Sequence, residues 1–104
     1  PDIKLISQLQ IQLADLYLKA FREFHKLLKP MASVIMIFPT FTTYDRIYFL
    51  EIVPKILSLG FSQMNFFPVD LIAKYNLKPT FRSTILYGGK TEFINREIVA
   101  FKKT

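Results

Sequence analysis

Apolar side chains recur every three or four residues between positions 3 and 28, which is the period of one face of a helix. Charged residues such as Lys19 and Glu23 lie off this stripe, and Pro30 cannot continue a helix. The pattern therefore predicts an amphipathic helix over residues 3–28. Its apolar face consists of Leu9, Leu13, Leu16, Tyr17, Ala20, Phe21, Phe24, Leu27 and Leu28.

The next segment, residues 33–38, reads SVIMIF and shows no polar alternation. Such a run is typical of a strand that is buried on both faces in a parallel sheet. Pro39 lacks the N–H group that a sheet ladder needs, so we expect the strand to end there. A central strand needs neighbours, yet the preceding residues predict only a helix.

The rest of the chain alternates between helical and extended patterns. Residues 45–59 predict a helix with a kink near Pro54, and Gly60 stands where a helix C-terminal glycine is expected. A strand is predicted at 61–67, a short helical turn or irregular segment at 70–79, a strand-like stretch at 82–89 and a final strand at 94–103. This order is typical of the α/β class, and the connection from 34–38 to 61–67 is long enough for a parallel crossover.

Composition narrows the possible functions. The chain has 104 residues, enough for one domain, with a net charge of +6. It has no cysteine and one histidine, which excludes thiol chemistry and argues strongly against a zinc site. Its longest apolar run is far shorter than a membrane span. The positive charge favours polyanionic partners such as nucleic acid, and a basic surface that serves solubility explains it equally well.

Several segments, taken in order, resemble a known family. The stretch LYLKAFREFHKLLKP is followed by an apolar strand ending in IFP, a helix ending in LGF, another strand, R-x-x-ILY and REIVAFKK. This order resembles the C-terminal half of class I S-adenosylmethionine-dependent methyltransferases. The likeness is greatest to the RNA methylases that include tRNA guanosine methyltransferases acting on an exocyclic amine. That group has LKPGG before its fifth strand, whereas Met31 and Ala32 replace the two glycines here. The resemblance covers nearly the whole chain.

The resemblance implies a fold. In that family the strand order is 3-2-1-4-5-7-6, with the seventh strand antiparallel between the fifth and the sixth. Residues 33–38, 61–67 and 95–102 would be strands 5, 6 and 7 of a partial Rossmann-like methyltransferase sheet, and residues 1–104 would form one domain. The N-terminal half would be absent, including the fourth strand that would lie beside 33–38.

The resemblance also places the chemistry outside this chain. The glycine-rich cofactor loop and the Asp/Asn-Pro-Pro-aromatic motif both belong to the absent half. We therefore expect no catalytic, cofactor-binding or metal-binding residue here, and a chain that is inactive alone. S-adenosylmethionine would be the cofactor of the parent transferase.

Two groups of residues are candidates for the RNA side of such an enzyme. The first follows the carboxyl end of the buried strand, where open α/β sheets bind ligands, and Phe41 there is placed to stack on a flipped-out base. It is a predicted substrate-side loop of Pro39, Thr40, Phe41 and Thr42, and a turn with a helix N-cap is the plainer interpretation. The second group consists of predicted phosphate contacts, with a solvated basic loop as the alternative: Lys74, Lys78 and Arg82.

Other residues receive structural interpretations. Arg96 and Glu97 are interpreted as an ion pair, His25 as a residue at the boundary of the core, and Lys102 and Lys103 as a frayed basic end.

The expected partners follow from these assignments. They are RNA, in particular tRNA during its processing, and either the missing N-terminal half or another chain that completes the sheet. A homodimer through the apolar edge at 33–38 is also expected. We further expect a cytoplasmic location and no membrane partner. Two alternatives stay open: a small standalone basic α/β domain that binds nucleic acid or protein, and a methyltransferase-like subunit.

Overall fold

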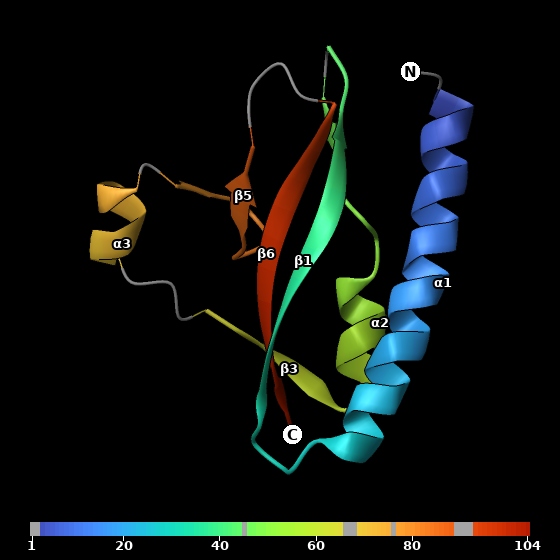
Figure 1. Cartoon of the computed structure of the whole chain (residues 1–104), viewed down its shortest axis with the longest axis vertical. Coiled ribbons are helices and arrows are strands. Elements are labelled where there is room, and N and C mark those ends of the chain that lie inside the picture. Colours follow the sequence, from blue (N-terminus) through green and yellow to red (C-terminus); the bar gives the residue numbers. More distant parts are fainter. Residues whose placement is uncertain (1–2, 45, 66–68, 76, 89–92) are drawn as a thin grey trace.

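A curled antiparallel sheet forms the frame of the molecule, and the helices labelled α1 and α2 lie on one face of it (Figure 1). The computed structural model describes residues 3–44, 46–65, 69–75, 77–88 and 93–104. The helices are α1 (Ile3–Leu27), α2 (Val53–Ser58) and α3 (Val69–Lys74). The strands are β1 (Ser33–Thr42), β2 (Ile47–Tyr48), β3 (Phe61–Met64), β4 (Lys78–Pro79), β5 (Ile85–Tyr87) and β6 (Ile94–Lys103).

The final strand β6 organises this six-stranded sheet. Its N-terminal part pairs with β5 and its C-terminal part with β3 along one edge, and β1 pairs along the other edge. Thus β6 lies between β1 and β3 and is antiparallel to both. Every hydrogen-bonded pair of described strands is antiparallel, so the fold is mixed α/β without the parallel pairing of a Rossmann-like sheet.

The predicted first helix is confirmed as α1, and most of its apolar stripe faces the sheet. Phe21 is fully buried, and Leu9, Leu13 and their neighbours pack against the same cluster. Leu16 and Leu27 belong to the predicted stripe but are not buried: 61% and 81% of their surfaces are exposed. The helix therefore buries a narrower face than the sequence pattern indicates.

The expectation that the apolar strand is buried on both faces was wrong. Along β1 the side chains alternate: Phe38 is buried toward the helices, whereas Ile35 and Ile37 are 57% and 53% exposed on the opposite face. Successive side chains of a strand point to opposite faces, and helices α1 and α2 cover only one of them. An unbroken apolar run therefore leaves an apolar open face.

The expectation that Pro39 ends this strand was also wrong, because β1 continues to Thr42. The Thr42 N–H donates to the Phe93 carbonyl at 2.7 Å, so N–H groups of even-numbered β1 residues point toward β6. The nitrogen of Pro39 therefore faces the outer edge, where a missing donor costs no ladder bond. As a consequence, Pro39–Thr42 form the end of a strand and not a loop.

The helix predicted over 45–59 is confirmed only over Val53–Ser58, as α2; β2 and a turn precede it, and residue 45 lies outside the described residues. Pro54 lies in the first turn of the short helix α2, where a proline costs no hydrogen bond, so it begins a helix instead of kinking one. Gly60 is confirmed as the residue after the helix, with φ of +102°. A Cβ atom on Gly60 would collide with the ring of His25, which packs edge-on against Phe61 at a centroid distance of 5.6 Å.

The predicted elements after Gly60 are shorter in the structure. The strand predicted at 61–67 is β3, and residues 66 and 67 lie outside the described residues. The short helical turn predicted within 70–79 is α3. The stretch predicted at 82–89 contributes β5, residue 89 lies outside the described part, and the final strand is confirmed as β6.

The basic C-terminal end is ordered, contrary to expectation. Strand β6 runs through Lys103, whose ammonium group donates to the backbone carbonyls of His25 and Leu28 at the end of α1. A cation there satisfies carbonyls that have no partner within the helix and favours the negative end of the helix dipole. The chain end therefore ties the sheet to the helix layer.

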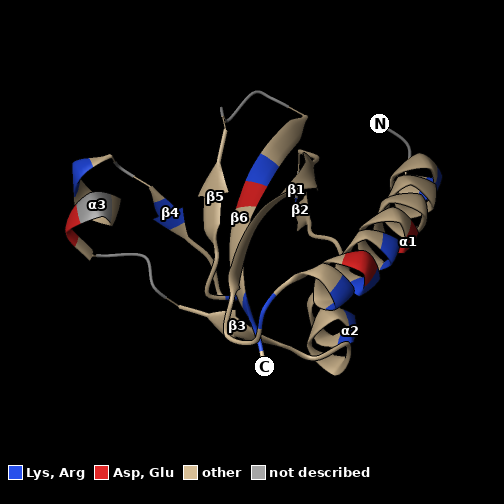
Figure 2. Ribbon diagram, turned by 60° about the horizontal axis from the view of Figure 1, so that its bottom comes forward, with Lys and Arg blue, Asp and Glu red and all other residues tan. Residues whose placement is uncertain are grey.

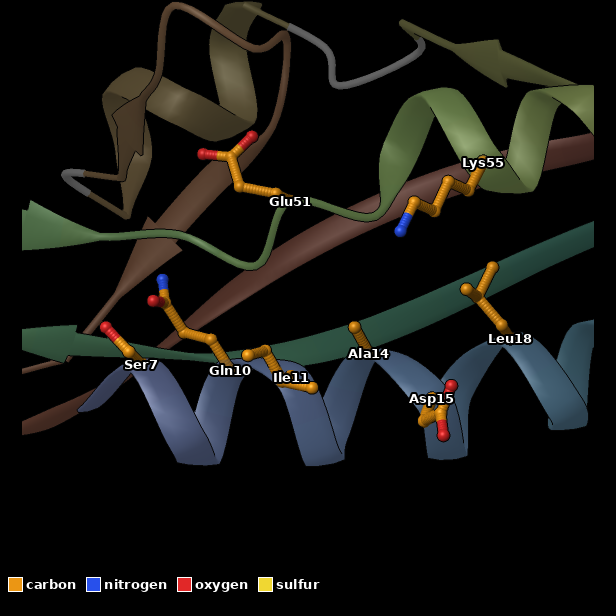
Figure 3. A pocket seen from close by; sticks show the side chains of 8 residues that line it. All are labelled: Ser7, Gln10, Ile11, Ala14, Asp15, Leu18, Glu51 and Lys55. Atoms are coloured by element: carbon orange, nitrogen blue, oxygen red, sulfur yellow. The ribbon is translucent and has the colours of Figure 1, made fainter. Parts of the chain in front are cut away.

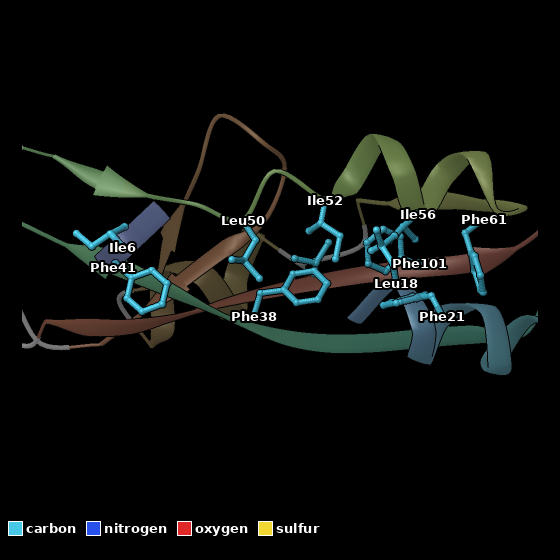
Figure 4. Packing of buried hydrophobic residues seen from close by; sticks show 11 residues of the cluster. Ile6, Leu18, Phe21, Phe38, Phe41, Leu50, Ile52, Ile56, Phe61 and Phe101 are labelled. Atoms are coloured by element: carbon cyan, nitrogen blue, oxygen red, sulfur yellow. The ribbon is translucent and has the colours of Figure 1, made fainter. Parts of the chain in front are cut away.

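The hydrophobic core is rich in aromatic rings and lies between β1, β6 and the helices (Figure 4). Phe21 from α1 meets Phe61 and Phe101 in edge-to-face contacts, with ring centroids 5.3 and 5.1 Å apart. The cluster extends along the sheet to Ile6 and Phe41 at its other end. This layer fixes the carboxyl end of β1 and the segment that precedes α2.

Candidate nucleic-acid interface

A groove of about 640 Å³ lies where the carboxyl end of β1, strand β2 and strand β4 meet. Its polar lining consists of Thr42, Thr43, Arg46, Lys78 and Thr80. Its apolar lining consists of Ile47, Phe49, Pro79, Phe81 and Leu86. The described residues that line this groove include two cations and no carboxylate, so its charge suits an anionic ligand.

Aromatic rings stand beside the cations of this groove. The Arg46 guanidinium lies 4.6 Å from the centre of the Tyr48 ring. Phe49 and Phe81 meet edge to face, with their centroids 5.6 Å apart. Phe81 is 87% exposed, so most of its ring surface faces solvent. Cations for phosphates beside rings for bases are the combination that single-stranded nucleic acids bind.

A second, smaller pocket of about 290 Å³ shares Phe49 and Phe81 with the groove. Glu51, Gln63 and Arg82 contribute its polar side chains. The Arg82 guanidinium lies over the Phe49 ring at 5.1 Å. The two hollows thus lie on either side of one pair of phenylalanines.

The Arg82 side chain is held inside the protein. Its Nε lies 3.3 Å from the Oε2 of Glu97, and its Nη1 donates to the Leu50 carbonyl at 2.9 Å. Glu97 is fully buried and also accepts a hydrogen bond of 2.6 Å from the Thr84 hydroxyl. The ion-pair partner of Glu97 is therefore Arg82 and not the expected Arg96. Arg96 precedes Glu97 in β6, and neighbouring side chains of a strand point to opposite faces of the sheet.

Burial raises the pKa of the Glu97 carboxyl above its ordinary value. The Thr84 hydrogen bond and the Arg82 charge lower that pKa, and the charge of Glu51 raises it further. Within the described structure, Glu97 Oε1 and the hydroxyl of Thr40 are buried without a hydrogen-bond partner. The interior beside the groove is therefore polar and incompletely satisfied.

The structure separates the residues of the predicted substrate-side segment. Phe41 is only 2% exposed and packs against Phe93, so it belongs to the core. Thr40 is fully buried and Pro39 is half-buried. Thr42 lines the groove, and its hydroxyl accepts a hydrogen bond from the Asn95 amide at 2.8 Å.

The predicted phosphate contacts also differ from one another. Lys78 is exposed and lines the groove, whereas Arg82 is engaged with Glu97. Lys74 lies on α3 with its ammonium 5.4 Å from the Tyr75 ring, and it is not among the lining residues of the groove. The role of all three toward RNA stays a prediction.

Sequence reasoning missed Arg46, Phe49 and Phe81. A signal for Phe81 was present, because a lone phenylalanine inside the polar turn Thr80-Phe81-Arg82-Ser83 has no apolar neighbour to pack against locally. Arg46 and Phe49 were missed because both fall in the part of the predicted helix 45–59 that is not helical in the structure.

Another hollow, of about 350 Å³, lies between α1 and the segment that leads into α2 (Figure 3). Asp15, Glu51 and Lys55 line it, so charges of both signs meet there. Figure 2 shows that Lys and Arg also occur along α1, α2 and β6, so positive charge is not confined to the groove. What distinguishes the groove is its combination of cations with exposed aromatic surface.

Two further findings concern metal sites and membrane spans in the part of the chain that the structure describes. They contain no group of histidine, aspartate and glutamate side chains that is arranged to hold a metal ion. None of the helices in the described ranges is long and apolar enough to cross a membrane.

Comparisons with models of protein families, with curated proteins and with solved structures found no match to this chain.

Proposed function

We propose that this chain is the substrate-side, C-terminal portion of an S-adenosylmethionine-dependent RNA methyltransferase that acts on tRNA in the cytoplasm. The observation that carries the proposal is the basic and aromatic groove at the carboxyl end of β1, formed by residues such as Arg46, Lys78 and Phe81. If β1 is one strand of a larger, mostly parallel sheet in the parent enzyme, this is the end of the strands at which ligands would bind. The position of β6 between β1 and β3 agrees with the expected order of strands 5, 7 and 6.

The groove suits RNA better than it suits a small metabolite. Its two cations attract phosphates without specifying a sequence, and its aromatic rings offer surfaces to unpaired bases. A net charge of +6 supports the same class of partner. The role of the chain would be to bind and orient the RNA.

S-adenosylmethionine does not fit the groove. The groove lacks a lining carboxylate that would bind ribose hydroxyls. Gly60 follows α2, and a side chain on Gly88 would collide with Asn95, so neither glycine belongs to a cofactor loop. The cofactor would bind to the N-terminal half of the parent enzyme and would supply the methyl group there.

The outer edge of β1 is where we place the partner that completes the sheet. Strand β2 pairs only with Phe41 and Thr42, so in the described structure the edge from Ser33 to Thr40 has no neighbouring strand. Ser33–Thr42 contains no charged residue, and natural edge strands usually carry charges that prevent pairing with other chains. The missing N-terminal half or another chain would pair there.

Removing the groove cations should weaken RNA binding. We expect the double variant Arg46→Gln/Lys78→Gln to bind single-stranded oligouridylate more weakly and with a salt dependence that is flatter by about 1.4 in the log–log slope, because two phosphate contacts are lost. Filter binding over a salt series measures this change. The matched control, Lys19→Gln/Arg22→Gln, removes two exposed charges from α1. Equal losses in both double variants would contradict the assignment of the groove.

The bare edge of β1 should make the isolated chain self-associate. We expect dimers or larger species at tens of micromolar in sedimentation, and expect Ile37→Lys to shift the protein toward monomer because a charge on an edge strand opposes pairing. Ile94→Lys is the control, since Ile94 is similarly exposed (51% against 53%) but lies on β6. A wild-type chain that sediments as a monomer would argue against this edge as an interface.

A second candidate function is that of a standalone basic domain that binds nucleic acid and catalyses no reaction. One observation favours it: the described residues of this chain form a hydrophobic core of their own between the sheet and helices α1 and α2. Full RNA affinity of the chain by itself would favour this alternative, whereas a large gain in affinity when an N-terminal half is supplied would favour the methyltransferase proposal.

A further inference from the structure

The turn that carries Phe81 is unusually well anchored for a surface turn. The Thr80 N–H donates to the Thr84 carbonyl at 2.9 Å, and the Arg82 N–H donates to the Thr80 hydroxyl at 3.1 Å. The two threonine hydroxyls lie 2.6 Å apart, and the Gln63 amide donates to the Arg82 carbonyl at 2.6 Å. Both neighbours of Phe81 are therefore fixed by hydrogen bonds.

The same turn is tied to the protein interior. Arg82 reaches inward to Glu97 and to the Leu50 carbonyl, and Thr84 donates to Glu97 as well. The Phe81 side chain, by contrast, is 87% exposed. An exposed phenylalanine on a flexible loop is common and needs no explanation. A turn held this firmly presents the ring at one fixed place, so binding to the ring costs little conformational entropy.

The surroundings of the ring indicate what it would bind. Phe81 and Lys78 line the same groove, together with Arg46. The edge-to-face contact with Phe49 uses only part of the Phe81 surface. A nucleotide combines a flat base with an anionic phosphate, which are the two features that an exposed ring beside cations can bind. An acidic peptide would use the cations but not the flat ring.

We infer that Phe81 is a stacking platform for one unpaired nucleobase, with Arg46 and Lys78 binding the adjoining phosphates. The inference rests on the proposed RNA-binding function and names the substrate feature that the groove recognises: an unstacked base in a single-stranded stretch. It replaces Phe41, which the core holds, as the aromatic residue that contacts the base. A base that is paired within a duplex has no open face for the ring.

The test compares Phe81→Ala, Phe81→Leu and Phe81→Trp in binding to single-stranded RNA that contains 2-aminopurine, whose fluorescence falls on stacking. Loss of a base–aromatic stack should weaken binding of Phe81→Ala by about 5- to 150-fold and abolish the quenching. Phe81→Leu should behave like Phe81→Ala, because it keeps an apolar side chain but has no flat ring. Phe81→Trp should retain both affinity and quenching.

An abasic oligonucleotide of the same length separates stacking from phosphate binding. The wild type and Phe81→Ala should bind it equally, because it has phosphates but no bases. Urea unfolding of each variant shows that the fold is intact, which is expected for so exposed a residue. If Phe81→Ala binds the base-containing RNA as tightly as the wild type while Arg46→Gln/Lys78→Gln does not, the stacking inference fails and the proposed function stands. If neither set of variants changes RNA binding, both fail.

Discussion

Replacing Phe21 with alanine should lower the free energy of unfolding by about 3–5 kcal/mol, the range for a large aromatic side chain in a packed core. Phe21 is fully buried at the centre of the aromatic cluster. Its ring lies within 5.4 Å, centroid to centroid, of Phe24, Phe61 and Phe101. Truncation would remove these contacts together and leave a cavity between α1 and the sheet, because close-packed neighbours relax only partly into the space.

Urea unfolding followed by circular dichroism would measure the loss. Domains of this size are typically stable by about 5–15 kcal/mol, so the variant should be close to unfolding without denaturant. Leu16→Ala is the matched control: it truncates the same helix, but Leu16 is 61% exposed, and the effect should stay within about 0.5 kcal/mol. Similar losses in the two variants would show that α1 does not pack on the sheet through Phe21.

These two residues also show what the pattern of apolar positions can and cannot predict. Helical periodicity placed Leu16 and Phe21 on one stripe, and it correctly predicted a helix with a core-facing side. It could not set the width of the buried face, because that depends on what the helix packs against. In this protein the core residues opposite the helix come from β1, β3, β6 and the segment that includes α2.

The same limit explains the errors at β1. Absence of polar alternation at 33–38 correctly predicted a strand, but the inference of burial on both faces assumed a cover that the described chain does not provide. Because helices cover only one face of this strand, the isoleucines at positions 35 and 37 on its other face are exposed. Pro39 misled for a related reason, since a proline stops a strand only where its nitrogen would face a ladder partner.

The candidate site was predictable in part. Thr42 and Lys78, more than thirty residues apart in the chain, were both named from sequence and both line the groove. Arg82 was predicted as a phosphate contact because of its charge, but its side chain turns inward to pair with Glu97. Nothing in the sequence of the strand that contains Glu97 marks this residue as the partner of Arg82. Long-range pairings between β5 and β6 bring these residues together, and no local pattern encodes such pairings.

That pairing leads to the second large effect. Arg82→Met should destabilise the protein by about 3–5 kcal/mol at neutral pH, because it leaves the fully buried Glu97 carboxylate without its compensating charge. The double variant Arg82→Met/Glu97→Met removes both charges and should recover much of the loss, since a buried ion pair can often be replaced by apolar residues at little cost. Arg96→Met, an exposed neighbour on the same strand, should change stability by no more than about 0.5 kcal/mol.

The dependence on pH distinguishes a charge effect from a packing effect. Burial already raises the pKa of Glu97 in the folded protein, and loss of Arg82 raises it further. Because the folded state then binds a proton more tightly than the unfolded state, stability is greatest below the unfolded-state pKa of about 4.3 and falls as the pH rises through the folded-state pKa. The stability deficit of Arg82→Met should therefore shrink when urea unfolding is repeated at mildly acidic pH, and the double variant should lack this contribution. A deficit that is the same at neutral and acidic pH would mean that Arg82 stabilises the turn through packing alone, with no part for the charge of Glu97.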